Sequence, residues 1–298
     1  MTEITKLLAI IGCAKAGTTA LAHHMDAHPE VRLGHRKETM YFSTMGQETW
    51  SGPRGDNFSQ TITTDYDVFA NNFGDHAASD WLVDASTDYV WRAETPALLA
   101  EYGAQRDVRV VCVVRDPVDR AISEYNHTLR QKLETLSFTE SLKAEEDRHA
   151  KRWHPLFYHR RRSTISEDID RYADRFGDRL MIIDYADLTD AGAVTERLCA
   201  FLGIPAMSVS EMERRNETLI PRNALVQSAL KNQTLRGLSR SILPKRFRTK
   251  LRTKLIVNAR DMKTVQPEER ALFQDMIADE IEACVRNPLI PTDNWTCV

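Results

Sequence analysis

Residues 12–19 read Gly12-Cys13-Ala14-Lys15-Ala16-Gly17-Thr18-Thr19, and they join an apolar run, residues 5–11, to a segment with helical spacing that Pro29 ends. A strand, a loop of small residues and a helix, in this order, form the opening unit of a nucleotide-binding α/β sheet. Backbone N–H groups at such a helix start attract anions, and Lys15 adds a positive charge. The stretch therefore predicts a phosphate-binding loop; the alternative is an ordinary glycine turn.

The loop departs from the Walker A motif of nucleoside triphosphatases. That motif, G-x-x-x-x-G-K-[ST], places its lysine directly after the second glycine. Here Lys15 lies two positions before Gly17, and Thr18 occupies the place of the Walker lysine. The sequence therefore disfavours a magnesium-dependent nucleoside triphosphatase, and a kinase with a degenerate P-loop is kept as an alternative function.

A second strand-to-helix unit lies further along the chain. Residues 108–114 are β-branched and almost entirely apolar, as expected of a parallel strand that is covered on both faces. Asp116 and Pro117 suit the N-cap and first position of a helix. Arg115 ends the strand, where ligands bind open α/β sheets, and Ser123 follows two turns into the helix. A guanidinium and a hydroxyl suit a terminal phosphate, although the Arg-Asp-Pro stretch could also serve only to begin the helix.

The rest of the chain extends the alternation of strands and helices. A further strand is predicted at 180–183, and helices are predicted at 118–133, 194–202 and 267–285. This order indicates an α/β fold of the P-loop-like kind, with a mostly parallel central sheet flanked by helices. Because no linker or repeat interrupts the pattern, we expect residues 1–298 to form a single domain.

Composition narrows the class of protein. The 298 residues include 40 Lys and Arg against 43 Asp and Glu, with a formal net charge of −3 and 42% hydrophobic residues. This balance argues against a disordered polyelectrolyte and against a basic nucleic-acid-binding protein. No apolar run reaches the ~20 residues of a membrane span, and none resembles a signal peptide. The five cysteines form no C-x-x-C pair, so we expect neither disulfides nor a zinc site, and a cytoplasmic location.

The two phosphate motifs together resemble a known family. G-x-x-K-x-G-T-T after the first strand, with R-D-P-x-x-R-x-x-S-x-Y later, is similar to the sulfotransferases that use 3′-phosphoadenosine-5′-phosphosulfate (PAPS) and release 3′-phosphoadenosine-5′-phosphate (PAP). The resemblance implies that the first loop, through Lys15, Ala16, Gly17, Thr18 and Thr19, binds the 5′-phosphosulfate. It implies that Arg115 and Ser123 bind the 3′-phosphate.

Further matches resemble the heparan-sulfate-type and bacterial branches of that family more than the phenol-type branch. They are His28-Pro29, Lys37-Glu38-Thr39-Met40-Tyr41-Phe42, Asp84-Ala85-Ser86-Thr87-Asp88-Tyr89, Tyr185-Ala186-Asp187-Leu188 and Phe201-Leu202-Gly203-Ile204-Pro205. The resemblance covers most of residues 7–205 in the order expected for the family.

The resemblance also implies catalytic roles. Glu38 matches the catalytic glutamate of the heparan-sulfate-type enzymes and is the expected general base, while His35 is a rival because phenol-type relatives use a histidine. Lys15 is expected to stabilise the leaving phosphate. Asp84 and Asp88 match positions that contact the acceptor in relatives. No cluster of His, Cys or carboxylate residues has metal-ligand spacing, so no metal is expected.

Three segments are candidates for a helical lid over the cofactor and the acceptor. They are residues 128–164, with an aromatic and arginine-rich part; 216–223, where Arg222 matches a Pro-Arg element of bacterial relatives; and the basic segment 231–263. The basic segment carries eleven Lys and Arg residues and one acid, so it suits the 3′-phosphate, an anionic acceptor, an anionic membrane surface or plain solvent exposure. The aromatic residues could equally belong to the core.

The sequence thus predicts sulfuryl transfer from PAPS to a hydroxyl, less readily an amine, of a small molecule, lipid or saccharide. A kinase and a non-catalytic nucleotide-binding module remain the alternatives, because a fold alone does not establish a function. No nucleic acid partner is expected.

Overall fold

The structure is a computed structural model that describes residues 3–78, 80–206, 219–221, 256–258 and 265–298. The chain divides into two compact units, Met1–Glu213 with Val265–Val298, and Arg214–Thr264. In the second unit, strands β6 (Leu219–Pro221) and β7 (Ile256–Asn258) pair antiparallel. Arg222 and all of the basic segment 231–263 except 256–258 lie outside the described residues, so the roles predicted for them stay predictions. The single-domain organisation likewise stays a prediction.

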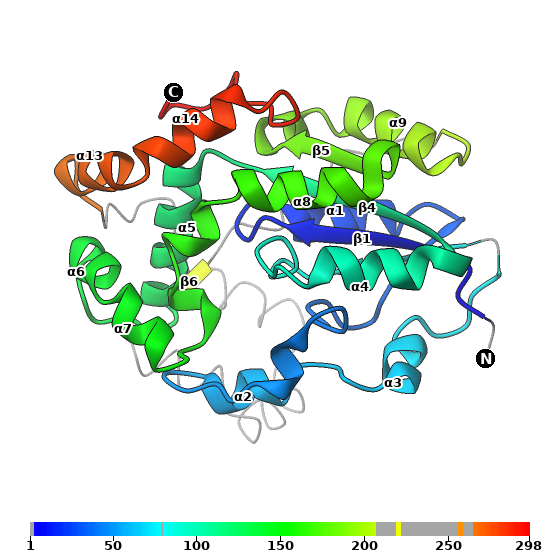
Figure 1. The fold of residues 1–298 in the computed structure, drawn as a ribbon, viewed down its shortest axis with the longest axis horizontal. Coiled ribbons are helices and arrows are strands. Elements are labelled where there is room, and N and C mark those ends of the chain that lie inside the picture. Colours follow the sequence, from blue (N-terminus) through cyan, green and yellow to red (C-terminus); the bar gives the residue numbers. More distant parts are fainter. Residues whose placement is uncertain (1–2, 79, 207–218, 222–255, 259–264) are drawn as a thin grey trace. The chain divides into compact units, whose positions relative to one another are not determined.

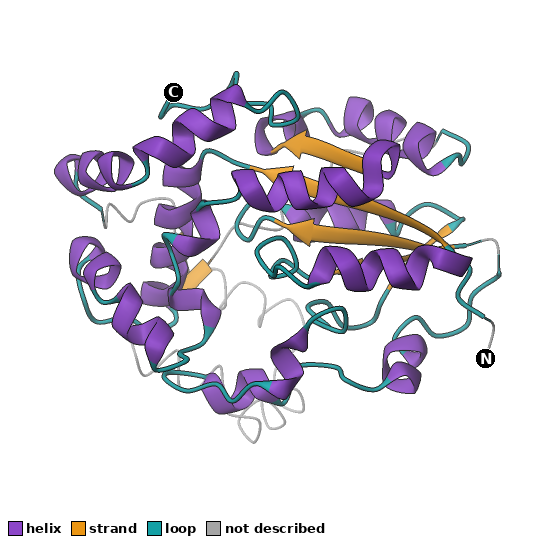
Figure 2. Ribbon diagram, in the orientation of Figure 1, coloured by secondary structure: helices purple, strands orange, loops and turns teal. Residues whose placement is uncertain are grey.

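The first unit is built on one sheet of five parallel strands (Figures 1 and 2). The strands are β1 (Lys6–Gly12), β2 (Val31–Leu33), β3 (Trp81–Ala85), β4 (Asp107–Val114) and β5 (Leu180–Asp184). Their spatial order is β2-β3-β1-β4-β5, and every neighbouring pair runs parallel. The predicted parallel α/β sheet is therefore confirmed, and the near-continuous apolar runs predicted as strands are its buried centre.

Helices cover both faces of this sheet. The long ones are α1 (Thr18–Met25), α4 (Thr95–Tyr102), α5 (Pro117–Arg130), α8 (Ser166–Phe176) and α9 (Ala191–Leu202). In Figure 1, α4 and α8 lie in front of the strands and α1 lies behind them. This division follows from right-handed crossovers, because the chain leaves β1 toward one edge of the sheet and leaves β4 toward the other.

The strand order places a topological switch point between β1 and β4. The connection after β1 leads to β2 at one edge, whereas the connection after β4 leads to β5 at the opposite edge. In open α/β sheets the crevice beyond the carboxyl ends of two such strands is the usual ligand site. The loop 13–17 and Arg115 follow these two strands directly, so the fold brings the two predicted phosphate motifs to one crevice.

The remaining described elements are α-helices of 5 to 10 residues and short 3₁₀ turns. The α-helices are α2 (Gly55–Ser59), α3 (Tyr66–Asn71), α6 (Phe138–Lys143), α7 (Glu145–Ala150), α13 (Pro267–Met276) and α14 (Ala278–Arg286). The 3₁₀ turns are η1 (Thr44–Gln47), η2 (Gly103–Gln105), η3 (Pro155–Phe157), η4 (Arg161–Ser163), η5 (Gly177–Arg179) and η6 (Tyr185–Thr189). The single helix predicted at 267–285 is instead two helices, because Ile277, with φ −121°, leaves the helical conformation and buries its side chain.

The predicted lid segment 128–164 is helical, but its aromatic residues belong to the core. Phe157 and Tyr158 are 0% and 1% exposed, and Trp153 packs edge-on against Phe157. The alternative reading of these residues as core is therefore the one that the structure supports. No helix among the described residues is long and apolar enough to cross a lipid bilayer.

Candidate functional site

The first loop ends in an open helix start. Gly17 is the N-cap of α1 with φ 84°, and its place is tight, because a Cβ there would lie 2.6 Å from Cδ1 of Leu188. The first N–H groups of α1, from Thr18 onward, have no intrahelical acceptor because they lie at the start of the helix. No side chain caps this helix start in their place. The N–H of Ala16 is already used, since it donates to the carbonyl of Cys13 over 3.2 Å. The binding role predicted for this loop, with Ala16 to Thr19, stays a prediction.

Lys15 is a half-buried cation in a positive environment. Burial, together with Arg130, Arg115 and Arg120, lowers the pKa of Lys15 to about 8, and Glu124 opposes the shift. Among the described residues, no carboxylate forms an ion pair with the Lys15 ammonium. An uncompensated cation beside an uncapped helix start is the arrangement that a phosphate or sulfate would complete.

Arg115 joins the two motifs physically. Its Nη1 donates to the backbone carbonyl of Lys15 over 2.8 Å, and its guanidinium lies 4.6 Å from the centre of the Tyr185 ring. Ser123 lies half-buried on α5, and Asp116 caps that helix as predicted. Arg115 is paired with no carboxylate in the described part of the chain, so its charge is available to an anionic ligand.

Glu38 lies at the carboxyl end of β3, beside the first loop. Its Oε2 accepts the backbone N–H of Thr87 over 2.7 Å, and its Oε1 lies 3.9 Å from the ammonium of Lys37. Lys37 in turn donates to Oγ1 of Thr19 over 2.8 Å, which links the Glu38 segment to the start of α1. Burial raises the pKa of Glu38, and the positive charge of Lys37 is the main effect that opposes this rise. The Glu38 side chain is 39% exposed, so contact with solvent also limits the rise.

The backbone is strained at both Lys15 and Glu38. Both have left-handed conformations, with φ 69° and 59°. Such conformations cost a non-glycine residue of order 1–3 kcal/mol and cluster at functional sites. His35, the rival base, is exposed and lies beside Gly74 instead. The geometry therefore favours Glu38 over His35 as the group that faces the phosphate loop, and its role as base stays a prediction.

The two predicted acceptor contacts have different surroundings. Asp84 is 1% exposed and accepts hydrogen bonds from Thr39, Ser86 and Tyr89 at 2.8–3.1 Å. Asp88 forms a buried ion pair with Arg162 at 2.6 Å. Both carboxylates are already bound by protein groups in this structure, and their contact with an acceptor stays a prediction.

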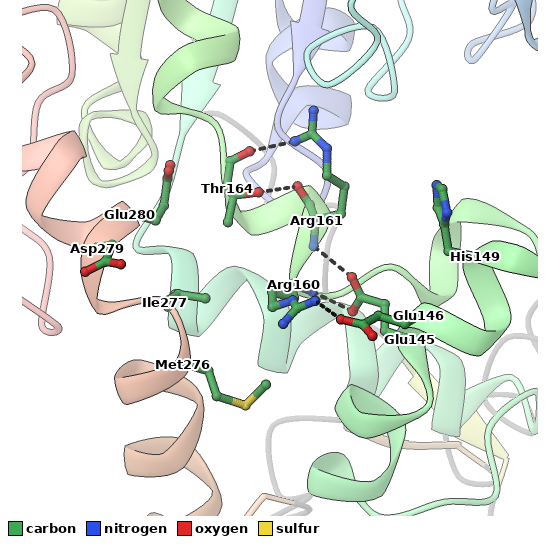
Figure 3. Close-up of a pocket in the computed structure, with 10 residues that line it drawn as sticks. All are labelled: Glu145, Glu146, His149, Arg160, Arg161, Thr164, Met276, Ile277, Asp279 and Glu280. Atoms are coloured by element: carbon green, nitrogen blue, oxygen red, sulfur yellow. Dashed lines mark hydrogen bonds and ion pairs between the residues drawn. The ribbon is translucent and has the colours of Figure 1, made fainter.

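The arginine cluster 160–162 is held by internal ion pairs. Arg160 pairs with the exposed Glu146, Arg161 pairs with Asp168, and Arg162 is buried between carboxylates. Arg160 and Arg161 line a cavity of about 540 Å³ beside α7 and the junction of α13 and α14 (Figure 3). None of the predicted site residues lines that cavity. Among the described residues, the charges of this cluster are therefore used in internal ion pairs, and the cluster does not form an open anion-binding surface.

Sequence reasoning assigned no role in the site to Lys37, Thr87 and Arg130, whereas helical spacing already placed His127 on the face of Ser123. Arg130 follows Ser123 at i+7, so the same spacing could have added it to that face of α5. The Nε of Arg130 is buried without a hydrogen-bond partner in the described residues. Burial and the charges of Lys15 and Arg130 lower the pKa of His127 to about 4, so this imidazole is neutral at pH 7. No sequence pattern connects Lys37 to Thr19.

The structure shows no metal centre in the part of the chain that it places. No group of three or more His, Cys, Asp and Glu side chains among those residues could hold a metal ion. All five cysteines are buried.

The described fold is an α/β protein with a parallel sheet, and the segments after β1 and β4 bring Lys15 and Arg115 together. The model of the sulfotransferase family matches residues 8–208. Because this match spans more than half of the sequence, the chain belongs to the sulfotransferase family. No curated protein matches it.

One solved structure supports this assignment, and two more distant ones are also similar to this chain. A sulfotransferase from Alicyclobacillus acidocaldarius is 30% identical, with 73% of this chain and 87% of that chain covered and a TM-score of 0.66. The sulfotransferase domain of the Synechococcus PCC 7002 olefin synthase is 15% identical, covering 93% and 96%, with a TM-score of 0.41. Mouse sulfotransferase SULT7A1 complexed with PAP is 12% identical, covering 97% and 86%, with a TM-score of 0.45. The predicted family is confirmed, and the heparan-sulfate-type branch stays a prediction.

Proposed function

We propose that this protein transfers the sulfuryl group of PAPS to a hydroxyl group of a small molecule, lipid or saccharide. The observation that supports this most is the convergence of two uncompensated cations, Lys15 and Arg115, at the carboxyl ends of β1 and β4. Arg115 contacts the backbone of Lys15 directly, so both charges belong to one site. Family membership supplies the reaction class, and the described residues supply the groups that the reaction needs.

The described residues fit a nucleotide with two separate phosphate-bearing ends. The uncapped start of α1, with Lys15, Thr18 and Thr19, would hold the 5′-phosphosulfate. Arg115 and Ser123 would hold the 3′-phosphate, and the unpartnered Nε of Arg130 offers a further donor on the same helix. When bound, PAPS supplies an activated sulfuryl group and leaves as PAP.

Two residues of this chain perform the proposed chemistry. Glu38, oriented by the N–H of Thr87, accepts the proton of the acceptor hydroxyl. A carboxylate with a raised pKa holds that proton more readily than an ordinary one, which suits this task. Lys15 lies in a poorly solvated position, where its charge stabilises developing negative charge on the leaving phosphate more strongly than it would in water.

A Glu38→Gln variant tests the assigned base. The amide keeps the size of the side chain and cannot accept the proton, so turnover with PAPS should fall at least 100-fold while PAP binding by calorimetry stays within about threefold. Glu140→Gln, at an exposed capping position on α6, is the matched control and should leave turnover unchanged. Full turnover in the Glu38→Gln variant would reject this role.

Calorimetry with PAP and with ATP separates this function from the kinase alternative. Tight binding of PAP and weak binding of ATP with magnesium supports PAPS as the donor, and the reverse supports a kinase.

The acceptor is sought by incubating candidate hydroxyl compounds with PAPS and looking for the mass gain of one sulfuryl group. We also propose a cytoplasmic location, because five scattered, buried cysteines without a C-x-x-C pair suit a reducing compartment.

A further inference from the structure

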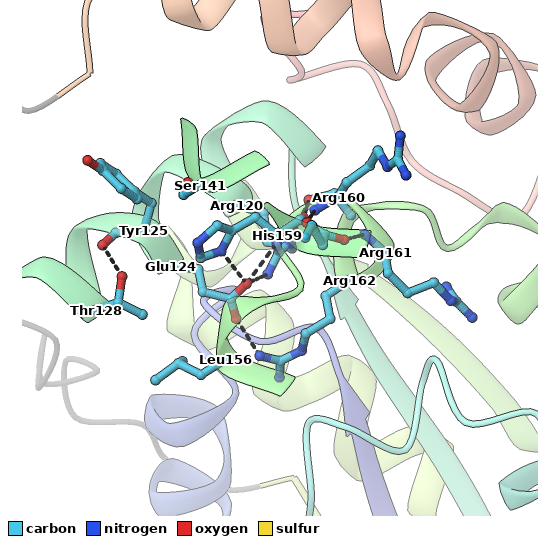
Figure 4. A network of polar contacts seen from close by, with 12 residues as sticks. Arg120, Glu124, Tyr125, Thr128, Ser141, Leu156, His159, Arg160, Arg161 and Arg162 are labelled. Carbon is cyan, nitrogen blue, oxygen red and sulfur yellow. Dashed lines mark hydrogen bonds and ion pairs between the residues drawn. The ribbon is translucent and has the colours of Figure 1, made fainter. Parts of the chain in front are cut away.

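Arg162 is buried between two carboxylates that belong to different parts of the site. Its Nη2 lies 2.6 Å from Oδ1 of Asp88. Its Nη1 forms an ion pair with Glu124, which Figure 4 shows. The side chains of Arg162, Asp88 and Glu124 are 6%, 5% and 0% exposed, so little solvent screens these pairs. Trp91 also donates its indole N–H to Asp88 over 2.7 Å, which fixes the carboxylate in place.

The two carboxylates sit next to residues with proposed roles. Asp88 directly follows Thr87, whose backbone N–H holds Glu38. Glu124 directly follows Ser123 on α5, the helix proposed to bind the 3′-phosphate. Arg162 therefore connects the loop that orients the base to the helix that binds the nucleotide, over separations of 74 and 38 residues in sequence.

We propose that Arg162 is a positioning residue of the sulfotransfer site, which holds the Thr87–Asp88 loop, and through it Glu38, against α5. This inference rests on the proposed role of Glu38 as the base. No part of it requires Arg162 to touch the donor or the acceptor. Arg120 is not equivalent, because it pairs with Glu124 at 3.1 Å, donates to Ser163 and the carbonyl of His159, and does not reach Asp88.

The pairing has an electrostatic consequence for Glu38. The charged groups that face Glu38 are Lys37, Asp88 and Arg162; Asp88 raises its pKa, whereas Lys37 and Arg162 lower it. Without Arg162 the negative charge of Asp88 stays beside Glu38 uncompensated. Glu124 keeps Arg120 and His159 as partners in that case, so the unbalanced charge is mainly that of Asp88. Arg162 thus keeps the base ionised at lower pH than its neighbours alone would allow.

The pH dependence of kcat/KM tests this role. In Arg162→Met, which keeps the length of the side chain and removes its charge, the acid limb of the profile should move up by about one pH unit. Arg160→Met is the matched control, because Arg160 pairs with Glu146, which is 83% exposed. Its acid limb should stay within about 0.3 unit of the native one.

Removing the charge of Asp88 should shift the acid limb in the opposite direction, and combining this change with Arg162→Met should restore the native profile. Asp88→Asn alone should move the acid limb below the native value, because Glu38 loses a negative neighbour and keeps Arg162. The double variant Arg162→Met with Asp88→Asn should return the limb to within about 0.5 unit of native. A purely structural Arg162 would lower the rate at every pH without moving the limb, and that result overturns the proposal.

A titration that does not need turnover separates this inference from the proposed function. The carboxyl carbon of Glu38 can be followed by ¹³C NMR in protein with labelled glutamate, and its resonance identified by its loss in Glu38→Gln. An upward shift of its titration in Arg162→Met supports the inference even if PAPS gives no turnover, which would reject only the proposed function. Should Arg162→Met fail to fold, Asp88→Asn decides: a lower titration supports the link, and an unchanged one overturns it.

Discussion

Lys15 carries a charge that the folded protein does not fully stabilise. Burial and nearby arginines lower its pKa to about 8, so at pH 8 about half of the molecules carry a neutral amine. A bound phosphate adds the missing negative charge and raises the pKa. We therefore expect PAP binding at pH 8 to take up about 0.5 proton, measured by calorimetry in buffers with different ionisation enthalpies.

The control for this prediction is Lys15→Met, in which the uptake should disappear. At pH 6 the native protein should bind PAP with nearly no proton uptake through Lys15, because its ammonium is then already formed. A proton uptake that is unchanged by Lys15→Met would assign the proton to another group.

Arg115 provides the most specific contact proposed for the nucleotide. Arg115→Ala should weaken PAP binding about 100-fold, and it should weaken binding of the same nucleotide without its 3′-phosphate less than fivefold, because a charge-assisted contact with phosphate is lost only in the first case. Calorimetry with both nucleotides measures the difference. Arg197→Ala, which removes an exposed ion pair with Asp187, is the control. If Arg115→Ala weakens the binding of both nucleotides equally, Arg115 does not contact the 3′-phosphate.

Helix α5 depends on a cap that also anchors the C-terminal segment. Oδ1 of Asp116 accepts the N–H groups of Val118 and Asp119, while Oδ2 accepts the N–H and hydroxyl of Thr296 at 2.8 and 2.9 Å. One carboxylate therefore begins α5, the helix proposed to bind the nucleotide, and also binds a segment 180 residues away. The low pKa of Asp116 reflects these hydrogen bonds, which outweigh the effect of its burial.

Asp116→Ala should lower the free energy of unfolding by about 3 kcal/mol, from the lost cap and from the lost charge-assisted bonds to Thr296. Asp190→Ala is the control, since Asp190 caps α9 through the N–H of Ala193 and should cost only about 1 kcal/mol. Urea unfolding of both variants measures the difference. Equal costs would mean that the C-terminal segment draws no stability from Asp116.

The elements that the sequence predicts well are those with long apolar runs. The sequence predicts residues 108–114 and 5–11 as strands because nearly all of their side chains are apolar, and the structure buries most of them on both faces of the sheet. Strand β3 was missed because five residues that include the buried Asp84 do not resemble a doubly covered strand. Strand β2 has only three residues, and its pairing with β3 is a tertiary contact.

The same limit applies to the candidate site. The sequence indicates Lys15 and Arg115 because Lys15 lies in the loop between a predicted strand and helix, and Arg115 ends a predicted strand. The Arg160–Arg162 cluster was ambiguous, because its partners, Asp88, Glu124, Glu146 and Asp168, are up to 74 residues away in sequence. Local sequence cannot tell a solvated arginine from one that is buried between carboxylates; only the fold makes that distinction.

Two half-buried histidines of the first unit, His127 and His154, have pKa values well below the usual one. His154 accepts the N–H of Leu156 through Nδ1 over 3.0 Å and packs on the Phe58 ring, and burial lowers its pKa to about 4. His127 has a similarly low pKa. Both pKa values lie below the unfolded value of about 6.5, so the unfolded chain binds more protons between pH 6.5 and 4. The contribution of the two neutral imidazoles to the free energy of unfolding is therefore fully present above pH 6.5 and is lost as the pH falls toward 4.

His154→Asn measures this effect on stability. Asparagine can still accept the Leu156 N–H, but it does not titrate, so near pH 5 the slope of unfolding free energy against pH should fall by about 1.4 kcal/mol per pH unit. The raised pKa values of Glu38 and Asp84 act in the opposite sense, so the test is the difference between variant and native protein. His23→Asn, on the exposed side of α1, should leave the slope unchanged. Parallel curves for His154→Asn and native protein from pH 4 to 7 would show that this imidazole titrates normally and that its site is open to water.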